Sequence, residues 1–276
     1  MATIEIRDAV TIITGASAGI GRAAADAFAG AGARVVLVAR DTPRMEEAAA
    51  AIRAAGGDAH AVPADVTRDE DVTRMVEGVL ARYGRIDILI CNAGVGLYGD
   101  VADLPMDALR RTFEVNYFGV VRCIQAALPS MRRPHSGRRP HSGLIQIVSS
   151  VIGRRSIPGY SGYCATKFAL YALAESLRIE LKNDGIRVQT VYPALTATGF
   201  SANAIIRNPA RSGAPRGMSA EKVAQHMLSA ARRGSRDRVI TVGGKLLTLA
   251  NSLAPGLVDA IVARVVKPHI DGPPAR

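Results

Sequence analysis

The chain has 276 residues, which is long enough for one large domain or two small ones. Hydrophobic residues make up 48% of it, which supports a sizeable core and excludes a disordered chain. The net charge of +11 suggests a nucleic-acid partner, but the arginines are spread along the chain and aromatic residues make up only 4%. Because nucleic-acid-binding proteins commonly stack bases on aromatic side chains, we expect no nucleic acid as a partner.

The sequence also indicates a compartment. No run of about 18 apolar residues is free of charges or helix breakers, so we expect no transmembrane span and at most peripheral membrane contact. The first ten residues lack the pattern of a signal peptide. The three cysteines, Cys91, Cys123 and Cys164, lie in apolar segments, which is typical of reduced, buried thiols. We therefore expect a cytoplasmic protein.

Short apolar runs alternate with alanine-rich helical patterns along most of the chain. Strands between helices that are continuous apolar runs form a parallel sheet buried on both faces. Right-handed crossovers then give a doubly wound α/β sheet of Rossmann type, here with about seven strands. We predict one such domain over 1–276, with its core at about 8–200. The expected strand segments are 10–14, 34–40, 59–65, 86–94, 144–150, 186–193 and 238–244, and the expected helices are 21–32, 43–57, 69–84, 105–131, the segment holding Tyr163, and 219–234.

One segment interrupts this alternation. Residues 132–143 read RRPHSGRRPHSG, a direct tandem copy of six residues. Removing one copy would leave an ordinary connection between a helix and a strand, so we interpret the segment as a lengthened, solvated loop. The alternative, a metal site at His135 and His141, lacks a third ligand, so we expect no metal.

A glycine-rich stretch, TGASAGIG, spans residues 14–21 between the first strand and the first helix. Gly15 permits the sharp turn out of the strand, Gly19 lets a pyrophosphate approach the backbone, and Gly21 lets the helix pack close to the sheet. The N-terminus of the helix offers free N–H groups and the positive end of its dipole to the phosphates. The predicted dinucleotide contacts of this stretch are Gly15, Ser17, Gly19, Ile20 and Gly21.

The tip of the second strand indicates which dinucleotide binds. A carboxylate there would hydrogen-bond the adenosine ribose of NAD. This chain has Ala39 followed by Arg40. Because a guanidinium holds a 2′-phosphate that an acid would repel, we expect NADP (NADPH), with NAD as the second choice. The alternative is that Arg40 is an ordinary surface arginine of an arginine-rich chain.

Tyr163 and Lys167 lie four residues apart in an apolar helical segment, GYSGYCATKFALYALAESL. Residues at this spacing share one face of a helix. A free phenol has a pKa of about 10, too high to exchange protons readily at neutral pH. A cation held nearby favours the phenolate and would lower the pKa of Tyr163. The pair therefore indicates general acid–base chemistry.

Five motifs occur in one order along the chain: Gly-x-x-x-Gly-Ile-Gly at 15–21, Asn-Ala-Gly at 92–94, Asn116, the serine pair at 149–150, and the Tyr163–Lys167 pair. In this order they resemble the short-chain dehydrogenase/reductase family, in its shorter single-domain branch, over roughly residues 8–200. The resemblance implies a nicotinamide cofactor and an oxidoreductase.

The resemblance also implies roles for four catalytic residues. Tyr163 would protonate a carbonyl oxygen or take the proton back in reverse, and Lys167 would bind the nicotinamide ribose. Ser150, thirteen residues before the tyrosine, would orient the substrate oxygen, with Ser149 as its structural neighbour. Asn116 would hold a water in a proton relay; the alternative is a polar group inside a helix that bonds the backbone.

Further cofactor contacts follow from the same resemblance. Asp65 and Val66 match the family's contacts to the adenine, although Asp65, Thr67 or Asp69 could instead cap the next helix. Asn92, Ala93 and Gly94 would end the fourth strand beside the adenosine, with Cys91 where the family usually has a second asparagine. Where the family shows Pro-Gly after the sixth strand, this chain has Pro193-Ala194. The contacts expected there are Pro193, Thr196 and Thr198.

The C-terminal part is more variable in composition. Residues 199–218 are expected to form a substrate-covering loop with at most one short helix, and Ser219 is expected to cap the helix that follows. The tail at 245–267 is expected to form two apolar helical pieces broken at Pro255-Gly256. We interpret the tail as a lid or as subunit packing. The alternative is an amphipathic surface that touches a membrane or holds a lipid-like substrate.

The resemblance therefore implies hydride transfer between NADP(H) and a small-molecule carbonyl or secondary alcohol, with Tyr163 as the general acid or base. Family members pair through the helices near 112–131 and 160–182, so we expect a homodimer or homotetramer. The alternatives are a catalytically weak NADP-binding scaffold or regulator of the same fold, and an epimerase or dehydratase on that fold.

Overall fold

A computed structural model describes residues 4–133, 143–206 and 217–266. Parts of three sequence predictions lie outside the described residues: most of the duplicated loop with His135 and His141, residues 207–216 of the substrate loop, and the end of the tail at Lys267. The described elements, in chain order, are β1 (Val10–Thr14), α1 (Gly19–Gly30), β2 (Arg34–Ala39), α2 (Thr42–Ala54), β3 (Asp58–Pro63), α3 (Asp69–Tyr83), β4 (Ile88–Cys91), α4 (Met106–Phe113), η1 (Glu114–Phe118), α5 (Gly119–Met131), β5 (Leu144–Val148), η2 (Val151–Gly153), α6 (Ser161–Glu180), β6 (Arg187–Tyr192), β7 (Thr196–Ala197), η3 (Ser201–Asn203), β8 (Met218–Ser219), α7 (Ala220–Arg233), β9 (Asp237–Val239), α8 (Val242–Leu253) and α9 (Pro255–Val266).

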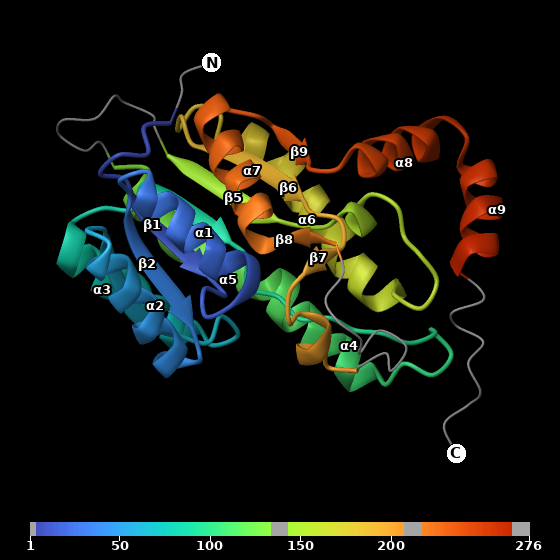
Figure 1. Cartoon of the computed structure of the whole chain (residues 1–276), viewed down its shortest axis with the longest axis horizontal. Coiled ribbons are helices and arrows are strands. Elements are labelled where there is room, and N and C mark those ends of the chain that lie inside the picture. The colour runs from blue at the N-terminus through green and yellow to red at the C-terminus, as the bar shows by residue number, and fades with distance from the viewer. Residues whose placement is uncertain (1–3, 134–142, 207–216, 267–276) are drawn as a thin grey trace.

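Parallel strands form the central sheet, in the order β3-β2-β1-β4-β5-β6-β9 (Figure 1). This is the doubly wound Rossmann-type arrangement that the alternating pattern predicts. The strand order reverses between β1 and β4, and such a reversal opens a crevice at the carboxyl ends of the strands. The glycine-rich stretch follows β1 directly, so the fold brings it to that crevice.

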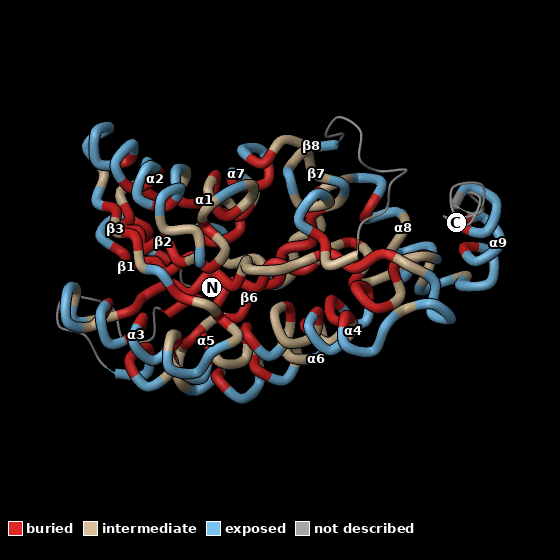
Figure 2. The backbone as a smooth tube through the Cα atoms, turned by 90° about the horizontal axis from the view of Figure 1, so that it is seen from below, coloured by how far each residue is buried: buried red, intermediate tan, exposed pale blue. Residues whose placement is uncertain are grey.

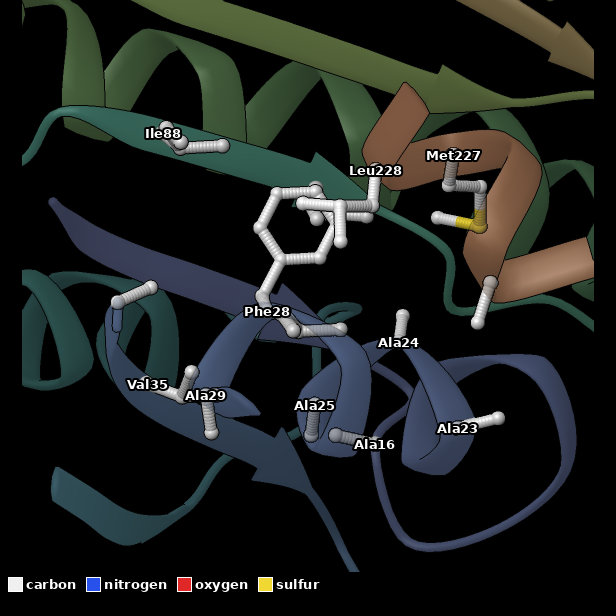
Figure 3. Packing of buried hydrophobic residues seen from close by; sticks show 14 of the residues in the cluster. Ala16, Ala23, Ala24, Ala25, Phe28, Ala29, Val35, Ile88, Met227 and Leu228 are labelled. Carbon is white, nitrogen blue, oxygen red and sulfur yellow. The ribbon is translucent and has the colours of Figure 1, made fainter. Parts of the chain in front are cut away.

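Helices cover both faces of the sheet (Figure 2). On one face, α1, α2 and α7 pack over a cluster of buried aliphatic side chains, and on the other face α3, α5 and α6 pack over a second cluster. The first cluster is centred on Phe28 of α1, which is fully buried and lies beside Ile88 of β4 and Leu228 of α7 (Figure 3). The small alanine side chains of α1 allow α7 to pack closely against α1.

The long helix predicted at 105–131 consists of α4, η1 and α5 in direct succession. The middle segment, η1, is a π-helical turn, which sequence periodicity does not distinguish from an ordinary helix. Such turns are rare and frequently occur at functional sites, and this one contains Asn116. Pro129 lies inside α5, two residues before the end of the helix.

The helix ends test the capping predictions. Gly84 ends α3 in the left-handed conformation. The Ser219 side chain accepts a hydrogen bond from the Lys222 N–H at the start of α7, as predicted. The alternative in which Asp65, Thr67 or Asp69 caps α3 does not hold, because Arg68 occupies the cap position and its side chain makes no capping bond. The Asp65 carboxylate bonds Thr67 instead, which closes a local turn before the helix.

The C-terminal part departs from prediction in two places. Strand β9 ends at Val239, short of the predicted 238–244, because Thr241 caps α8 by accepting from the Gly244 N–H. Strands β7 and β8 form a second, two-residue ladder that carries no periodic signal. The tail is two helices with Pro255 at the break, as predicted. Within the described ranges, every helix is too short or too polar to cross a bilayer.

The three cysteines are free and buried, as predicted. Burial raises the pKa of the Cys91 and Cys123 thiols, the latter to about 12. These thiols therefore stay protonated and act as small apolar side chains of the core.

Candidate active site

The loop between β1 and α1 is built around glycine. Gly15 and Gly19 have φ angles of +68° and +56°, a region that favours glycine. A Cβ at Gly21 would overlap the carbonyl oxygen of Gly15 and lie 2.5 Å from the Asn92 side-chain nitrogen. The loop is therefore tightly folded against the sheet, and it leaves backbone without side chains facing the crevice.

The N-terminus of α1 follows this loop. Its cap residue, Ala18, has no side chain that can bond the first-turn N–H groups, and the first turn contains no acid. Ser17 and Ile20 are partly buried beside it. Thr198 approaches the loop from the far part of the chain, since a Cβ at Gly19 would lie 3.3 Å from the Thr198 methyl carbon. The arrangement is a positively polarised cradle for an anion.

The ends of β1 and β4 are joined by side-chain hydrogen bonds. The Thr14 hydroxyl oxygen accepts from the backbone N–H groups of Asn92 and Ala93, at 3.0 and 3.1 Å. The Asn92 amide donates to the carbonyl oxygens of Thr14 and Gly15, at 3.0 and 3.2 Å. Thr14 carries no role in the sequence analysis, although it is the polar last residue of an otherwise apolar strand end. These bonds tie the glycine loop to the end of β4.

Arg40 and Asp65 meet at the ends of β2 and β3. The Arg40 guanidinium lies 3.7 Å from the Asp65 carboxylate, and 75% of the Arg40 side chain is exposed. Burial would raise the pKa of the Asp65 carboxyl, but hydrogen bonds from Thr67 and the charge of Arg40 lower it overall. The Val66 side chain packs in the core against Gly119 of α5, so any cofactor contact of Val66 would use its backbone.

The predicted acid–base pair lies on one face of α6. The Lys167 ammonium is 5.6 Å from the centre of the Tyr163 ring and donates to the Val148 carbonyl oxygen at the end of β5, at 3.1 Å. The Tyr163 phenol is hydrogen-bonded to the Ser150 hydroxyl. Ser149 points elsewhere and donates to the Lys167 carbonyl oxygen, at 3.1 Å. Ser150 is therefore the serine next to the phenol, in the place that the family resemblance implies.

Burial dominates the electrostatics of this pair. It raises the pKa of Tyr163, with the neighbouring Tyr98 and Cys164 acting in the same direction and the Ser150 hydrogen bond opposing. It lowers the pKa of Lys167 from an ordinary 10.5 to about 8. The predicted lowering of the Tyr163 pKa is therefore wrong for the described chain, because burial outweighs any effect of the Lys167 charge. The Tyr163 phenol therefore keeps its proton at neutral pH. The Lys167 ammonium loses its proton at a lower pH than an ordinary lysine does.

Asn116 is fully buried, and both its amide oxygen and its amide nitrogen form hydrogen bonds within the protein. The amide oxygen accepts from the Val95 N–H at 2.8 Å, and the amide nitrogen donates to the Val95 carbonyl and the Thr166 hydroxyl, at 2.9 and 3.1 Å. A Cβ at Gly94 would lie 3.2 Å from the Asn116 oxygen and 3.7 Å from the Lys167 nitrogen. Asn116 thus lies beside the lysine, and its amide bonds backbone as the alternative interpretation expects.

Gly153 is a second residue that the sequence analysis does not single out. It lies in η2, between Ser150 and α6, and a Cβ there would approach the Ser149 hydroxyl at 2.7 Å and the Lys167 Cβ at 2.9 Å. The only sequence signal is its place in the short connection between the serine pair and the tyrosine helix. Its lack of a side chain lets η2 pack directly on the face of α6 that carries Lys167.

Apolar and aromatic side chains surround the phenol. Tyr163 clusters with Leu97, and its ring meets the Phe200 ring edge-on at 5.7 Å between centroids. Tyr98 and Tyr160 form another edge-on pair, at 4.9 Å between centroids, and both belong to a small buried cluster. The Tyr163 ring is therefore held in an apolar and aromatic environment.

The segment after β6 closes the crevice from the other side. The Pro193 carbonyl accepts from the Val151 N–H at 2.9 Å and lies 3.5 Å from the Ser150 hydroxyl. The Thr196 hydroxyl donates to the Ala194 carbonyl at 3.0 Å, and the Thr198 hydroxyl accepts from the Phe200 N–H at 3.3 Å. Both threonine hydroxyls thus form hydrogen bonds within this segment. Of the two side chains, only that of Thr198 lies against the glycine loop.

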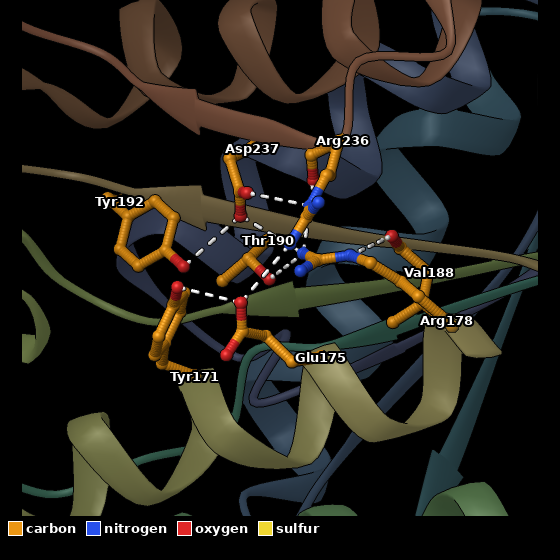
Figure 4. Close-up of polar contacts among 8 residues, drawn as sticks. All are labelled: Tyr171, Glu175, Arg178, Val188, Thr190, Tyr192, Arg236 and Asp237. Carbon is orange, nitrogen blue, oxygen red and sulfur yellow. Dashed lines mark hydrogen bonds and ion pairs between the residues drawn. The ribbon is translucent and has the colours of Figure 1, made fainter. Parts of the chain in front are cut away.

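A polar network fixes the far half of α6 (Figure 4). The Arg178 guanidinium donates to the Val188 carbonyl, the Thr190 hydroxyl and the Asp237 carboxylate, at 3.1, 2.8 and 3.0 Å. The Tyr192 hydroxyl donates to the same carboxylate. The network ties α6 to β6 and β9 and so orients the helix that carries the tyrosine and the lysine.

A crevice at the strand reversal, with a glycine loop on one side and a buried phenol on the other, is typical of dinucleotide-dependent oxidoreductases. The chain belongs to the short-chain dehydrogenase family, whose model matches residues 9–207, which confirms the predicted resemblance. It is similar to dehydrogenase/reductase SDR family member 7B of Mus musculus, with 33% identity over 94% of this chain and 81% of that protein. It is also similar to the uncharacterized oxidoreductase YxnA of Bacillus subtilis, with 32% identity over 95% of this chain and 73% of that protein.

Two solved structures show the same fold. A short chain dehydrogenase/reductase from Burkholderia phymatum, in complex with NAD, has a TM-score of 0.82 and 24% identity, covering 92% of this chain and 96% of that one. An alcohol dehydrogenase from the archaeon Thermococcus sibiricus, complexed with 5-hydroxy-NADP, has a TM-score of 0.71 and 30% identity, covering 84% of this chain and 94% of that one.

Proposed function

We propose that the chain is an NADP-preferring oxidoreductase that transfers a hydride between the cofactor and a carbonyl or secondary alcohol. The observation that carries the proposal is the Tyr163 phenol, which is buried, hydrogen-bonded to Ser150 and adjacent to the Lys167 ammonium. The Burkholderia and Thermococcus structures, which hold NAD and an NADP derivative, support a nicotinamide dinucleotide as the cofactor.

The residues at the crevice fit such a cofactor. The glycines of the β1–α1 loop leave room for a pyrophosphate, and the uncapped first turn of α1 offers N–H groups to it. When bound, the nicotinamide would supply or accept the hydride. The residues that would hold the cofactor are Gly15, Ser17, Gly19, Ile20, Gly21, Arg40, Asp65, Val66, Asn92, Ala93, Gly94, Tyr163, Lys167, Pro193, Thr196 and Thr198.

The protein's own residues would handle the proton. Because its pKa is raised, Tyr163 carries its proton at neutral pH and can donate it to a carbonyl oxygen. Ser150 would donate a second hydrogen bond to that oxygen as it gains charge. The nearby Lys167 cation would stabilise the phenolate that remains, and in the oxidative direction the phenolate would act as the base. Asn116, held in the π-helical turn, would hold a water in a proton relay beyond the lysine.

A substrate screen tests the proposal directly. Ketones and alcohols of graded size, each with NADPH and NADH, should reveal turnover that favours apolar substrates and NADPH. Tight NADPH binding without turnover of any carbonyl or alcohol would instead favour a scaffold protein of the same fold.

We predict that Arg40→Ala raises the KM for NADPH on the order of tenfold and changes the KM for NADH less than about twofold. The reason is that a guanidinium contributes charge-assisted hydrogen bonds only to the 2′-phosphate. The nearest following acid, Asp41, is engaged as the cap of α2, where it accepts from the Arg44 N–H. Initial rates with each cofactor give the two constants.

Arg74→Ala is the matched control, because Arg74 is similarly exposed, at 70%, and pairs with an aspartate on α3. It should leave both constants unchanged. Equal effects of Arg40→Ala on the two cofactors would show that Arg40 does not select NADP.

We also predict a fall in kcat/KM for NADPH as the pH rises through about 8. Because the pKa of Lys167 is lowered to about 8, its ammonium is charged below that pH and neutral above it. A neutral lysine would neither stabilise a phenolate nor donate as strongly to the cofactor. A pH profile of initial rates measures the midpoint, and a flat profile up to pH of about 10 would contradict the assignment.

A further inference from the structure

Helix α8 has its most apolar face turned away from the protein. Val242, Leu246, Leu249 and Leu253 recur every three or four residues and therefore form one face of the helix. Their side chains are between 58% and 76% exposed. By contrast, Gly244 on the other side of the helix is buried against Thr241, Val151 and Val239. A surface helix normally presents its apolar face to the core, so this orientation is the reverse of the ordinary one.

Helix α9 repeats the pattern. Leu257, Ile261 and Val265 recur every fourth residue and are 64%, 51% and 65% exposed. Val258 and Val262, on a neighbouring side of the helix, are buried. Both helices lie at one end of the molecule, beyond the edge strand β9 (Figures 1 and 2). We call the seven exposed residues the apolar stripe: Val242, Leu246, Leu249, Leu253, Leu257, Ile261 and Val265.

Two of the three charged residues on these two helices are positive. Lys245 and Arg264 are exposed, and Asp259 is the one acid between residues 242 and 266. The Asp259 carboxylate is already paired with the Arg155 guanidinium, at 2.7 Å. That ion pair joins α9 to the segment that follows Ser150 and η2. The surface around the apolar stripe therefore offers cations to a partner.

We propose that the apolar stripe docks on a membrane surface that carries anionic lipid headgroups. Aliphatic side chains would enter the boundary of the acyl chains, while the long stems of Lys245 and Arg264 would let their charges reach the headgroups. A second copy of the chain fits less well. It would bring the cations of both copies together, and the single acid is already paired within its own chain.

The length of the two helices gives a further reason for a partner. Each has 12 residues, a length at which an isolated helix is marginal in water. Packing on the protein is slight, because few of their side chains are buried. Contact of the apolar stripe with lipid would supply the missing stabilisation.

Vesicle sedimentation with the full-length protein tests the proposal. We expect the protein to sediment with vesicles of phosphatidylcholine and phosphatidylserine, and to bind less to phosphatidylcholine alone or at high salt. Leu246→Glu with Leu253→Glu should weaken this binding at least about tenfold, because each leucine removed from an apolar contact costs roughly that factor. Val101→Glu, at a loop position that is 73% exposed, is the matched control and should bind like the parent.

A fluorescent reporter keeps the test independent of the double substitution. The sequence contains no tryptophan, so Leu249→Trp introduces a single one. Its emission should shift to the blue when the anionic vesicles are added, and that of Val101→Trp should not. The proposal is overturned if the parent protein stays in the supernatant or the glutamate variant sediments like the parent. It is also overturned if the parent protein is a dimer that binds no vesicles and the glutamate variant is a monomer.

Discussion

Replacing Tyr163 with phenylalanine is expected to reduce kcat by about a thousandfold while changing the affinity for NADPH less than about threefold. The substitution removes the proton that the carbonyl oxygen needs, and a general acid of this kind contributes about 10² to 10⁴ in rate. The ring itself stays, so its edge-on contact with Phe200 and its packing on Leu97 are preserved. NADPH oxidation measures turnover, and a fluorescence titration with NADPH measures binding.

Tyr160→Phe supplies the control within the same region. Tyr160 is a buried phenol three residues earlier, which pairs with Tyr98 rather than with Ser150. Its removal should leave kcat within a few-fold of the parent. If Tyr163→Phe retained most of the parent's turnover, the phenol would have no part in the chemistry, and another acid would have to be sought in the crevice.

Gly21→Ala is expected to lower the free energy of unfolding by about 2 kcal/mol or more and to weaken NADPH binding at the same time. The new Cβ would overlap the Gly15 carbonyl and press on the Asn92 amide, and overpacking of this kind typically costs about 1–3 kcal/mol. Because these same groups shape the anion cradle, the cost should reach the cofactor site. Urea unfolding gives the stability, and titration with NADPH gives the affinity.

Gly30→Ala in the same helix is the matched control. A Cβ at Gly30 would meet nothing within 4 Å among the described residues, so the change only replaces a flexible residue with a better helix former. It should raise the free energy of unfolding by about 0.5 kcal/mol and leave the cofactor site alone. Similar stabilities for the Gly21 and Gly30 variants would mean that the β1–α1 loop is not tightly packed.

The features that could be predicted from the sequence are those that short segments of the chain determine. The β1–α1 turn is specified by Gly15, Gly19 and Gly21 within seven residues, and the shared face of Tyr163 and Lys167 follows from helical spacing alone. The order of strands and helices has the same local origin, because each element carries its own periodicity. The sheet topology then follows from general rules for parallel strands.

The features that were not predictable depend on residues far apart in the chain. The pKa of Tyr163 is raised because Phe200, Leu97 and Tyr98 converge on it from other elements, and no spacing along α6 reveals that burial. The bond from Asn116 to Thr166 crosses 50 positions, and that from Thr14 to Asn92 crosses 78. Strands β7 and β8 pair across the segment at 207–216, and two residues each are too few to show a pattern.

The π-helical turn constrains the number of residues that the long helix can contain. Across the π-helical turn, from α4 into α5, the buried positions include Ala108, Thr112, Asn116 and Val120, each four residues after the one before. A regular α-helix repeats at 3.6 residues, so such positions would rotate by about 40° per step and leave the protein interior after a few turns. The wider turn absorbs part of that rotation and keeps both halves in phase. A one-residue insertion or deletion between 114 and 118 would therefore turn one half by about 100° and bring charged side chains such as Arg122 into the core.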